Sequence, residues 1–150
     1  MFSCGFFGRR FEIDGTSFRS GIISFDGVVE VFESPLVEWD ETDYENSWYT
    51  ALQSVTAPQP TAAAIITKFA DLIIAPYVQW WPMYPDGQSI AIREQALFLE
   101  PIRGQVSISN LFLYVPKREV RSGLSSPSEW SIPLETVIAF RHCLGLISRP

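Results

Sequence analysis

Three Asp-Gly pairs each lie between runs rich in aromatic and β-branched residues, and this feature constrains the fold of the chain most strongly. They are Asp14-Gly15, Asp26-Gly27 and Asp86-Gly87. Asp-Gly suits two-residue β-hairpin turns because both positions tolerate the positive φ angles that these turns require. The first two pairs predict an antiparallel meander over residues 1–35, and the third predicts a hairpin within a second meander at about 61–99.

The segment between the two predicted meanders has the spacing of an amphipathic helix. Thr42 and Glu45 fit the Ser/Thr-x-x-Glu pattern of a capping box, and Pro58 disfavours helical geometry just before it. We therefore expect a central helix at about 42–56. Its apolar residues recur at i, i+4, i+7, i+8 and i+11, at Tyr44, Trp48, Ala51, Leu52 and Val55.

A second helix is expected near the end of the sequence, at about 133–146, with Ser131 near its N-cap. Residues 100–128 contain Pro, Gly and Ser at intervals, which predicts a mixture of strand and loop. The apolar residues that favour the second helix are Leu134, Val137, Ile138 and Leu144.

These elements predict an α+β fold in which two antiparallel β-meanders pack with a central helix and a C-terminal helix. With 150 residues, 47% of them hydrophobic, the chain has the size and composition of one domain, 1–150, with a single core. Two arrangements remain open, because the sheets can pack face to face or around the central helix.

Charge is distributed unevenly along the chain, whose formal net charge is −6. Residues 1–46 contain ten acids and three bases, whereas the remainder contains seven acids and eight bases. Such a field repels phosphate and attracts a basic protein, so we expect no nucleic-acid partner. The candidate partner-binding residues are Glu30, Glu33, Glu38, Trp39, Asp40, Glu41, Asp43 and Glu45.

Two structural alternatives apply to this acidic segment. Asp43 and Glu45 would also suit the positive end of the helix dipole. Trp39 lies among carboxylates after a proline, so it is either an exposed interface anchor or a buried loop tryptophan.

The sequence favours neither catalysis nor metal or cofactor binding. His142 and Cys143 are adjacent, and neighbours on a helix point about 100° apart, which does not suit a nucleophile and its base. The acidic segment lacks the glycine and distal glutamate of a calcium-binding loop. Cys4 and Cys143 are expected to be small buried hydrophobic residues of a reduced cytoplasmic protein. No run is long and apolar enough to span a membrane.

Five short motifs follow one another along the middle and end of the chain: Asn46-Ser47-Trp48, Trp80-Trp81-Pro82-Met83-Tyr84, Leu97-Phe98-Leu99, Val115-Pro116-Lys117-Arg118 and Ser128-Glu129-Trp130-Ser131. In order and spacing they resemble the immunity proteins of bacterial contact-dependent growth inhibition systems, the CdiI family. The resemblance implies a cytoplasmic protein that binds the C-terminal toxin domain of a large exported surface protein. Such toxins are often ribonucleases or other nucleases, whose basic surface would suit an acidic inhibitor, and we expect a monomer that forms a 1:1 heterodimer.

The tryptophans of these motifs are expected to be structural, because neighbouring residues such as Trp80 and Trp81 point to opposite faces of a strand. Two other functions remain as alternatives to immunity. Abundant aromatic residues on strands are compatible with a single-stranded nucleic-acid binding module, against which the acidity argues. A hydrolase that uses a pair of carboxylates is the third hypothesis.

Overall fold

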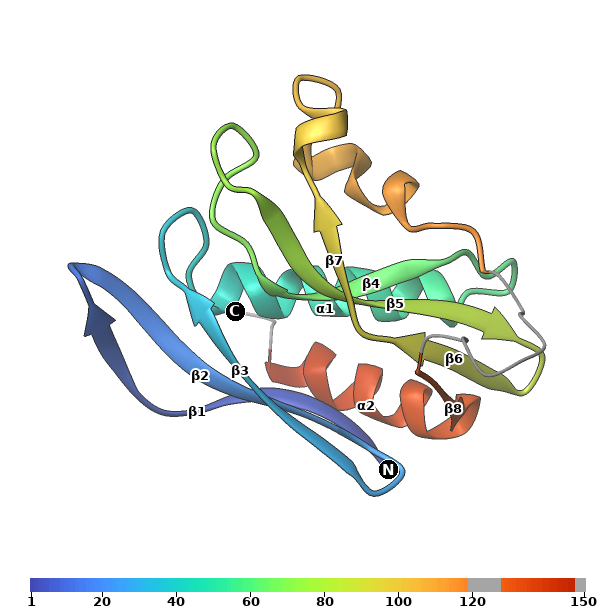
Figure 1. Cartoon of the computed structure of the whole chain (residues 1–150). Coiled ribbons are helices and arrows are strands. Elements are labelled where there is room, and N and C mark those ends of the chain that lie inside the picture. The colour runs from blue at the N-terminus through green and yellow to red at the C-terminus, as the bar shows by residue number, and fades with distance from the viewer. Residues whose placement is uncertain (119–127, 148–150) are drawn as a thin grey trace.

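A computed structural model of the protein describes residues 1–118 and 128–147. The first meander forms a three-stranded antiparallel sheet in the order β1-β2-β3 (Figure 1). Both connections are tight turns at the predicted Asp-Gly pairs, where Asp14 and Asp26 have φ of 50° and 44°. The strands are β1 (Phe2–Ile13), β2 (Thr16–Phe25) and β3 (Val28–Pro35).

The outer half of β1 departs from regular pairing with β2. The register shifts between Phe7 and Phe11, and Gly8 within this interval has φ of +70°, which a side chain would disfavour. Beyond the irregularity, pairing resumes at Phe11 and Phe18, whose rings stack with centroids 5.7 Å apart. The first hairpin therefore continues as an arm to the turn at Asp14.

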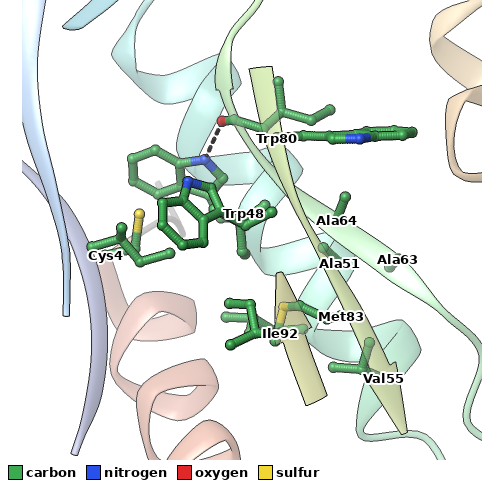
Figure 2. Packing of buried hydrophobic residues seen from close by; sticks show 14 of the residues in the cluster. Cys4, Trp48, Ala51, Val55, Ala63, Ala64, Trp80, Met83 and Ile92 are labelled. Atoms are coloured by element: carbon green, nitrogen blue, oxygen red, sulfur yellow. Dashed lines mark hydrogen bonds between the residues drawn. The ribbon is translucent and has the colours of Figure 1, made fainter. Parts of the chain in front are cut away.

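Helix α1 (Glu41–Val55) starts one residue before the predicted position and also ends one residue earlier. It buries Tyr44, Trp48, Ala51, Leu52 and Val55, the residues whose spacing predicted it. Trp48 reaches both sheets, since its indole nitrogen donates to the carbonyl of Ile66 at 2.7 Å (Figure 2) while its ring packs on Phe6 and Phe32.

The second sheet contains five strands in the order β4-β5-β6-β8, with β7 paired to β5. The single strand predicted over 88–99 is interrupted at Glu94, so its two parts pair with different halves of β5. The strands are β4 (Ala63–Lys68), β5 (Tyr77–Asp86), β6 (Ser89–Arg93), β7 (Gln95–Phe98) and β8 (Glu129–Pro133). The predicted fold class is thus confirmed, with α1 in contact with both sheets.

Strand β8 corrects the prediction for the start of the last helix. Ser131 pairs with Ala91 of β6 and does not cap a helix, because Glu129–Pro133 completes the sheet first. Helix α2 (Leu134–Ile147) follows directly and buries Val137 and Leu144. It packs on α1 and on β1, where the rings of Phe2 and Phe140 meet edge to face at 5.4 Å.

Residues 100–118 contain no strand, contrary to the prediction of mixed strand and loop. They form two short 3-10 helices, η1 (Glu100–Ile102) and η2 (Ile108–Tyr114), and bury Val106 and Leu111. The rest of the predicted segment, 119–127, lies outside the described residues.

The adjacent tryptophans of β5 are both buried. Trp81 packs on Phe25 of the first sheet, with ring centroids 5.9 Å apart, and on Trp130 of β8. Trp80 donates its indole N–H to the side chain of Gln95 at 3.1 Å. Alternate faces of one strand therefore bury one tryptophan each, as the sequence predicted.

Candidate functional site

The acidic segment lies at the start of α1, where two of its carboxylates cap the helix. Asp40 is the N-cap and accepts from the backbone N–H of Asp43 at 2.9 Å, and the Asp43 carboxylate accepts from the N–H of Asp40 at 3.0 Å. The capping box predicted at Thr42 and Glu45 is therefore wrong by two residues. Capping fixes both exposed carboxylates in position, and their negative charges remain in contact with solvent.

Glu41 is held by two arginines of the first hairpin. Arg10 donates to its two carboxylate oxygens at 2.8 and 2.6 Å, and Arg19 donates at 3.2 Å. The hydrogen bonds from Arg10, with a further contribution from Arg19, lower the pKa of Glu41 to about 2. This carboxylate therefore fastens the hairpin arm to α1, and its charge is already compensated within the chain.

Glu45 lies half-buried on the next turn of the helix. Burial raises the pKa of its carboxyl group, and the neighbouring charge of Glu41 raises it further, while Arg19 lowers it. Burial also raises the pKa of the Cys4 thiol, with a smaller contribution from Glu45. Glu45 is therefore less accessible to a partner than the exposed Asp40 and Asp43.

Trp39 is half-buried against the core. Its ring stacks on Phe69 with centroids 4.3 Å apart and meets Tyr44 edge to face at 5.1 Å. It also lines a small cavity of about 140 Å³ with Leu111 and Phe112 of η2. The indole therefore fixes the loop before α1 and leaves only part of its surface for contact with a partner.

The two acidic residues of β3 do not share a face. Glu30 and Glu33 are exposed, but three positions along a strand place them on opposite sides of the sheet. Glu30 faces toward Glu94, whose pKa is raised by burial first and by the charge of Glu30 second. The eight predicted residues therefore occupy three places, which are the start of α1 with its preceding loop and the two faces of β3.

Sequence reasoning missed an apolar surface beside the start of α1, formed mainly by the loop between β4 and β5. Ile73 and Ile74 in this loop are 78% and 79% exposed. A groove of about 330 Å³ lies next to the loop and is lined by residues that include Val37, Ala75, Pro76 and Tyr77. The sequence contained one signal for this loop, which was Asp71. Its side chain can form an Asx turn, and it lies two residues before the apolar pair Ile73 and Ile74 and shortly before Pro76.

The residues considered for catalysis lie on the solvent side of α2. His142 and Cys143 are both exposed, and His142 is 3.2 Å from the guanidinium of Arg141. Cys4 is buried as expected, but the prediction that Cys143 is buried is wrong, because the buried face of α2 passes through Val137 and Leu144. Within residues 1–118 and 128–147, no cluster of His, Cys, Asp and Glu could hold a metal ion.

The family model for the CdiI N-terminal domain matches residues 34–140. The chain belongs to the CdiI family. The match begins within β3 and extends into α2, so it includes α1 and the whole described part of the second sheet. It confirms the resemblance given by the sequence motifs.

A curated relative in the CdiI family is the immunity protein CdiI of Enterobacter cloacae. It is 25% identical over 139 residues, which cover 92% of this chain and 94% of the relative. A solved chain from the CdiA-CT/CdiI toxin and immunity complex of Enterobacter cloacae has a TM-score of 0.87 at 24% identity. That alignment covers 97% of this chain and 99% of the solved chain, so the CdiI fold extends over nearly the whole molecule. In the part of the chain that is described, no helix is long and apolar enough to cross a membrane.

Proposed function

We propose that this chain is an immunity protein that binds and neutralises the C-terminal toxin domain of a contact-dependent growth inhibition surface protein. The observation that carries the proposal is the CdiI family match over residues 34–140, together with a relative named immunity protein CdiI that aligns with 92% of the chain. Protection would take place in the cytoplasm, by a monomer that forms a 1:1 complex and performs no catalysis.

The charge of the chain supports a basic partner, such as a nuclease and in particular a ribonuclease. The formal net charge is −6, and no ion pair within the described residues compensates Glu30, Glu33 or Glu38. A nuclease needs a positive surface for its phosphate substrate, so an acidic inhibitor would be attracted to the same surface. The same field disfavours direct contact with nucleic acid.

The start of α1 is the proposed centre of the acidic contact. Glu38, Asp40 and Asp43 are exposed there on one short stretch of chain, and the partly exposed Trp39 lies between them. Glu41 and Glu45 would contribute less charge, because the first is paired with arginines and the second is half-buried. Glu30 and Glu33 remain candidates for contact at one face of β3 each.

The proposal is tested by titrating this protein into the purified toxin domain encoded immediately upstream of its gene, with calorimetric detection. We expect a 1:1 complex with a dissociation constant of about 1–10 nM, in the range of specific inhibitory complexes. Cleavage of total RNA by the toxin domain, measured in parallel, should cease at one equivalent. Absence of binding would contradict the immunity function, whereas binding without RNA cleavage by the toxin would contradict only its assignment as a ribonuclease.

A charge reversal at one residue tests the location of the acidic contact. Glu38→Lys should slow association about tenfold at low salt, with a smaller effect at high salt, because charge mainly governs the rate of encounter. Glu33→Lys changes the net charge equally and compares this position with the candidate contact on the outer face of β3. A larger effect of Glu33→Lys would move the contact to that face of the sheet.

The single-stranded nucleic-acid module remains the alternative to the immunity function. Its basis was the abundance of aromatic residues on strands, of which Trp80 and Trp81 are buried while Phe7 and Phe98 are exposed. No observation favours it over the immunity function.

A further inference from the structure

The loop between β4 and β5 is held in one conformation by side chains on both of its sides. The Asp71 carboxylate accepts from the backbone N–H groups of Ile73 and Ile74 at 2.8 and 2.6 Å. The Arg103 guanidinium, from the turn after η1, donates to the carbonyls of Leu72, Ile73 and Ala75. The backbone hydrogen bonds of Asp71 also lower the pKa of its carboxyl group. The loop is therefore ordered before any partner binds.

This ordered loop presents two adjacent isoleucines to water. Ile73 and Ile74 are 78% and 79% exposed, so neither side chain contributes appreciable burial to the fold. Their backbone amides, not their side chains, make the contacts that fix the loop. Exposed aliphatic side chains on a fixed backbone suit an interface, because little conformational entropy is lost when they become buried.

The loop leads from the two isoleucines to an adjoining groove, which the next residues, Ala75 and Pro76, help to line. Val37 and Tyr77 line this groove, and the ring of Tyr77 contacts Phe98, which is itself exposed. The groove reaches the loop before α1, because Val37 is followed directly by Glu38. The groove, whose lining also includes Lys68, is therefore bordered on one side by the acidic start of α1, which is the arrangement of a protein interface with a charged rim.

We propose that Ile73 and Ile74, with the groove beside them, form the apolar anchor at which the toxin domain docks, with Glu38 at the rim. This inference rests on the proposed immunity function and identifies the part of the surface that carries affinity. The partner surface would present an apolar recess next to basic side chains. The acidic rim then steers and orients the toxin domain, while burial of the isoleucines slows its dissociation.

Charge favours the toxin domain over a second copy of this chain as the occupant. In a symmetric dimer the same patch faces itself, so two chains of net charge −6 would meet close to their acidic α1 starts. Like charges brought together in this way oppose association. The acidic residues at the start of α1 would attract a basic partner, whereas they would repel a second copy of this chain.

The test compares two double variants that remove the same number of exposed aliphatic side chains. Ile73→Ser/Ile74→Ser should weaken calorimetric binding of the upstream-encoded toxin domain about 100-fold, as expected for a pair of anchor residues. Leu146→Ser/Ile147→Ser, at the exposed end of α2, is the control and should change the affinity less than about threefold. Thermal unfolding of both variants checks that they remain folded.

The outcomes separate this inference from the immunity function on which it rests. If the unmodified protein binds the toxin domain and Ile73→Ser/Ile74→Ser binds equally well, the anchor is overturned and the immunity function stands. If the unmodified protein does not bind, both fail. Sedimentation of the unmodified protein alone provides a further check, because a dimer that Ile73→Ser/Ile74→Ser dissociates would assign the patch to a second copy and overturn the proposal.

A photocrosslinking experiment gives an independent readout that does not depend on the stability of the double variant. Benzoylphenylalanine placed at Ile74 should crosslink to the toxin domain in the 1:1 mixture, whereas the same residue at Val31 should not. Crosslinking from Val31 alone would overturn the proposed anchor and direct attention to the outer face of the first sheet.

Discussion

The two sheets of this CdiI-family protein differ in how completely their faces are covered. In the second sheet, residues 63–67 of β4 are all buried, so both faces of that strand lie in the interior. In the first sheet, Ile23 and Phe25 are buried on the inner face, while Val29 and Val31 on the outer face are 57% and 62% exposed. Strand β4 of the second sheet is therefore buried on both faces. The first sheet buries only its inner face and exposes its outer face to solvent.

This difference indicates that stability is concentrated where α1 joins the two sheets. Trp48 contacts Phe6 and Phe32 of the first sheet and the Ile66 carbonyl of the second. The outer face of β3 takes no part in that contact, so its side chains can change with little effect on folding. Three substitutions test this comparison, in decreasing order of expected effect.

Trp48→Ala should have the largest effect and lower the free energy of unfolding by about 4 kcal/mol. It creates a cavity between the sheets and leaves the buried Ile66 carbonyl without its indole partner. Urea unfolding followed by far-UV circular dichroism measures the loss. Val31→Ala, on the outer face, should change the same quantity by less than about 0.5 kcal/mol. Equal losses for the two variants would show that both sheets contribute alike.

Ser34→Ala tests the direct link between the sheets. The buried Ser34 hydroxyl of β3 donates to the Thr67 carbonyl of β4, and its removal leaves that buried acceptor unsatisfied. We expect the free energy of unfolding to fall by about 1–2 kcal/mol. Ser20→Ala, at a partly buried position of β2, is the control. A loss no greater than that of the control would mean that the sheets are joined by packing alone.

Glu41→Gln should have the smallest effect and one that depends on pH. The pKa of Glu41 falls from 4.5 to about 2 in the folded protein, so its ion pairs stabilise the fold above pH 4.5 and lose this effect as pH falls toward 2. Because water partly screens these pairs, we expect a loss of at most about 1 kcal/mol at pH 7. Urea unfolding at pH 7 and pH 3 should show a difference that shrinks on acidification. Glu33→Gln, at an exposed carboxylate with no ion pair among the described residues, is the control, and an equal loss for it would contradict the role of the Glu41 ion pairs.

The parts of the fold that local sequence determines were predictable. The Asp-Gly turns placed the first sheet, and the spacing from Tyr44 to Val55 placed α1 within one residue. The cap was misplaced because Asp40 with Asp43 and Thr42 with Glu45 both fit capping patterns, and the two carboxylates make the bonds. Strand β8 was missed because it pairs with a strand far away in the sequence, since Glu129 of β8 lies opposite Arg93 of β6.

The candidate site was less predictable, because adjacency in sequence does not decide which face a residue occupies. Glu30 and Glu33 belong to one acidic run but lie on opposite faces of β3. Glu41 was counted as a free charge, whereas Arg10, far from it in sequence, neutralises it. The exposure of Ile73 and Ile74 likewise depends on Arg103, which lies about 30 residues further along the chain.

The contact between Phe2 and Phe140 has a consequence for how the protein is made. A ribosome adds about 5–20 residues per second, so the first strand waits roughly 7–28 s before its partner helix exists. Until then β6 also lacks β8 along its outer edge, and the inner face of the first sheet is only partly covered. Nascent chains therefore expose apolar surface of the first sheet and the unpaired edge of β6 until β8 and α2 have been synthesised.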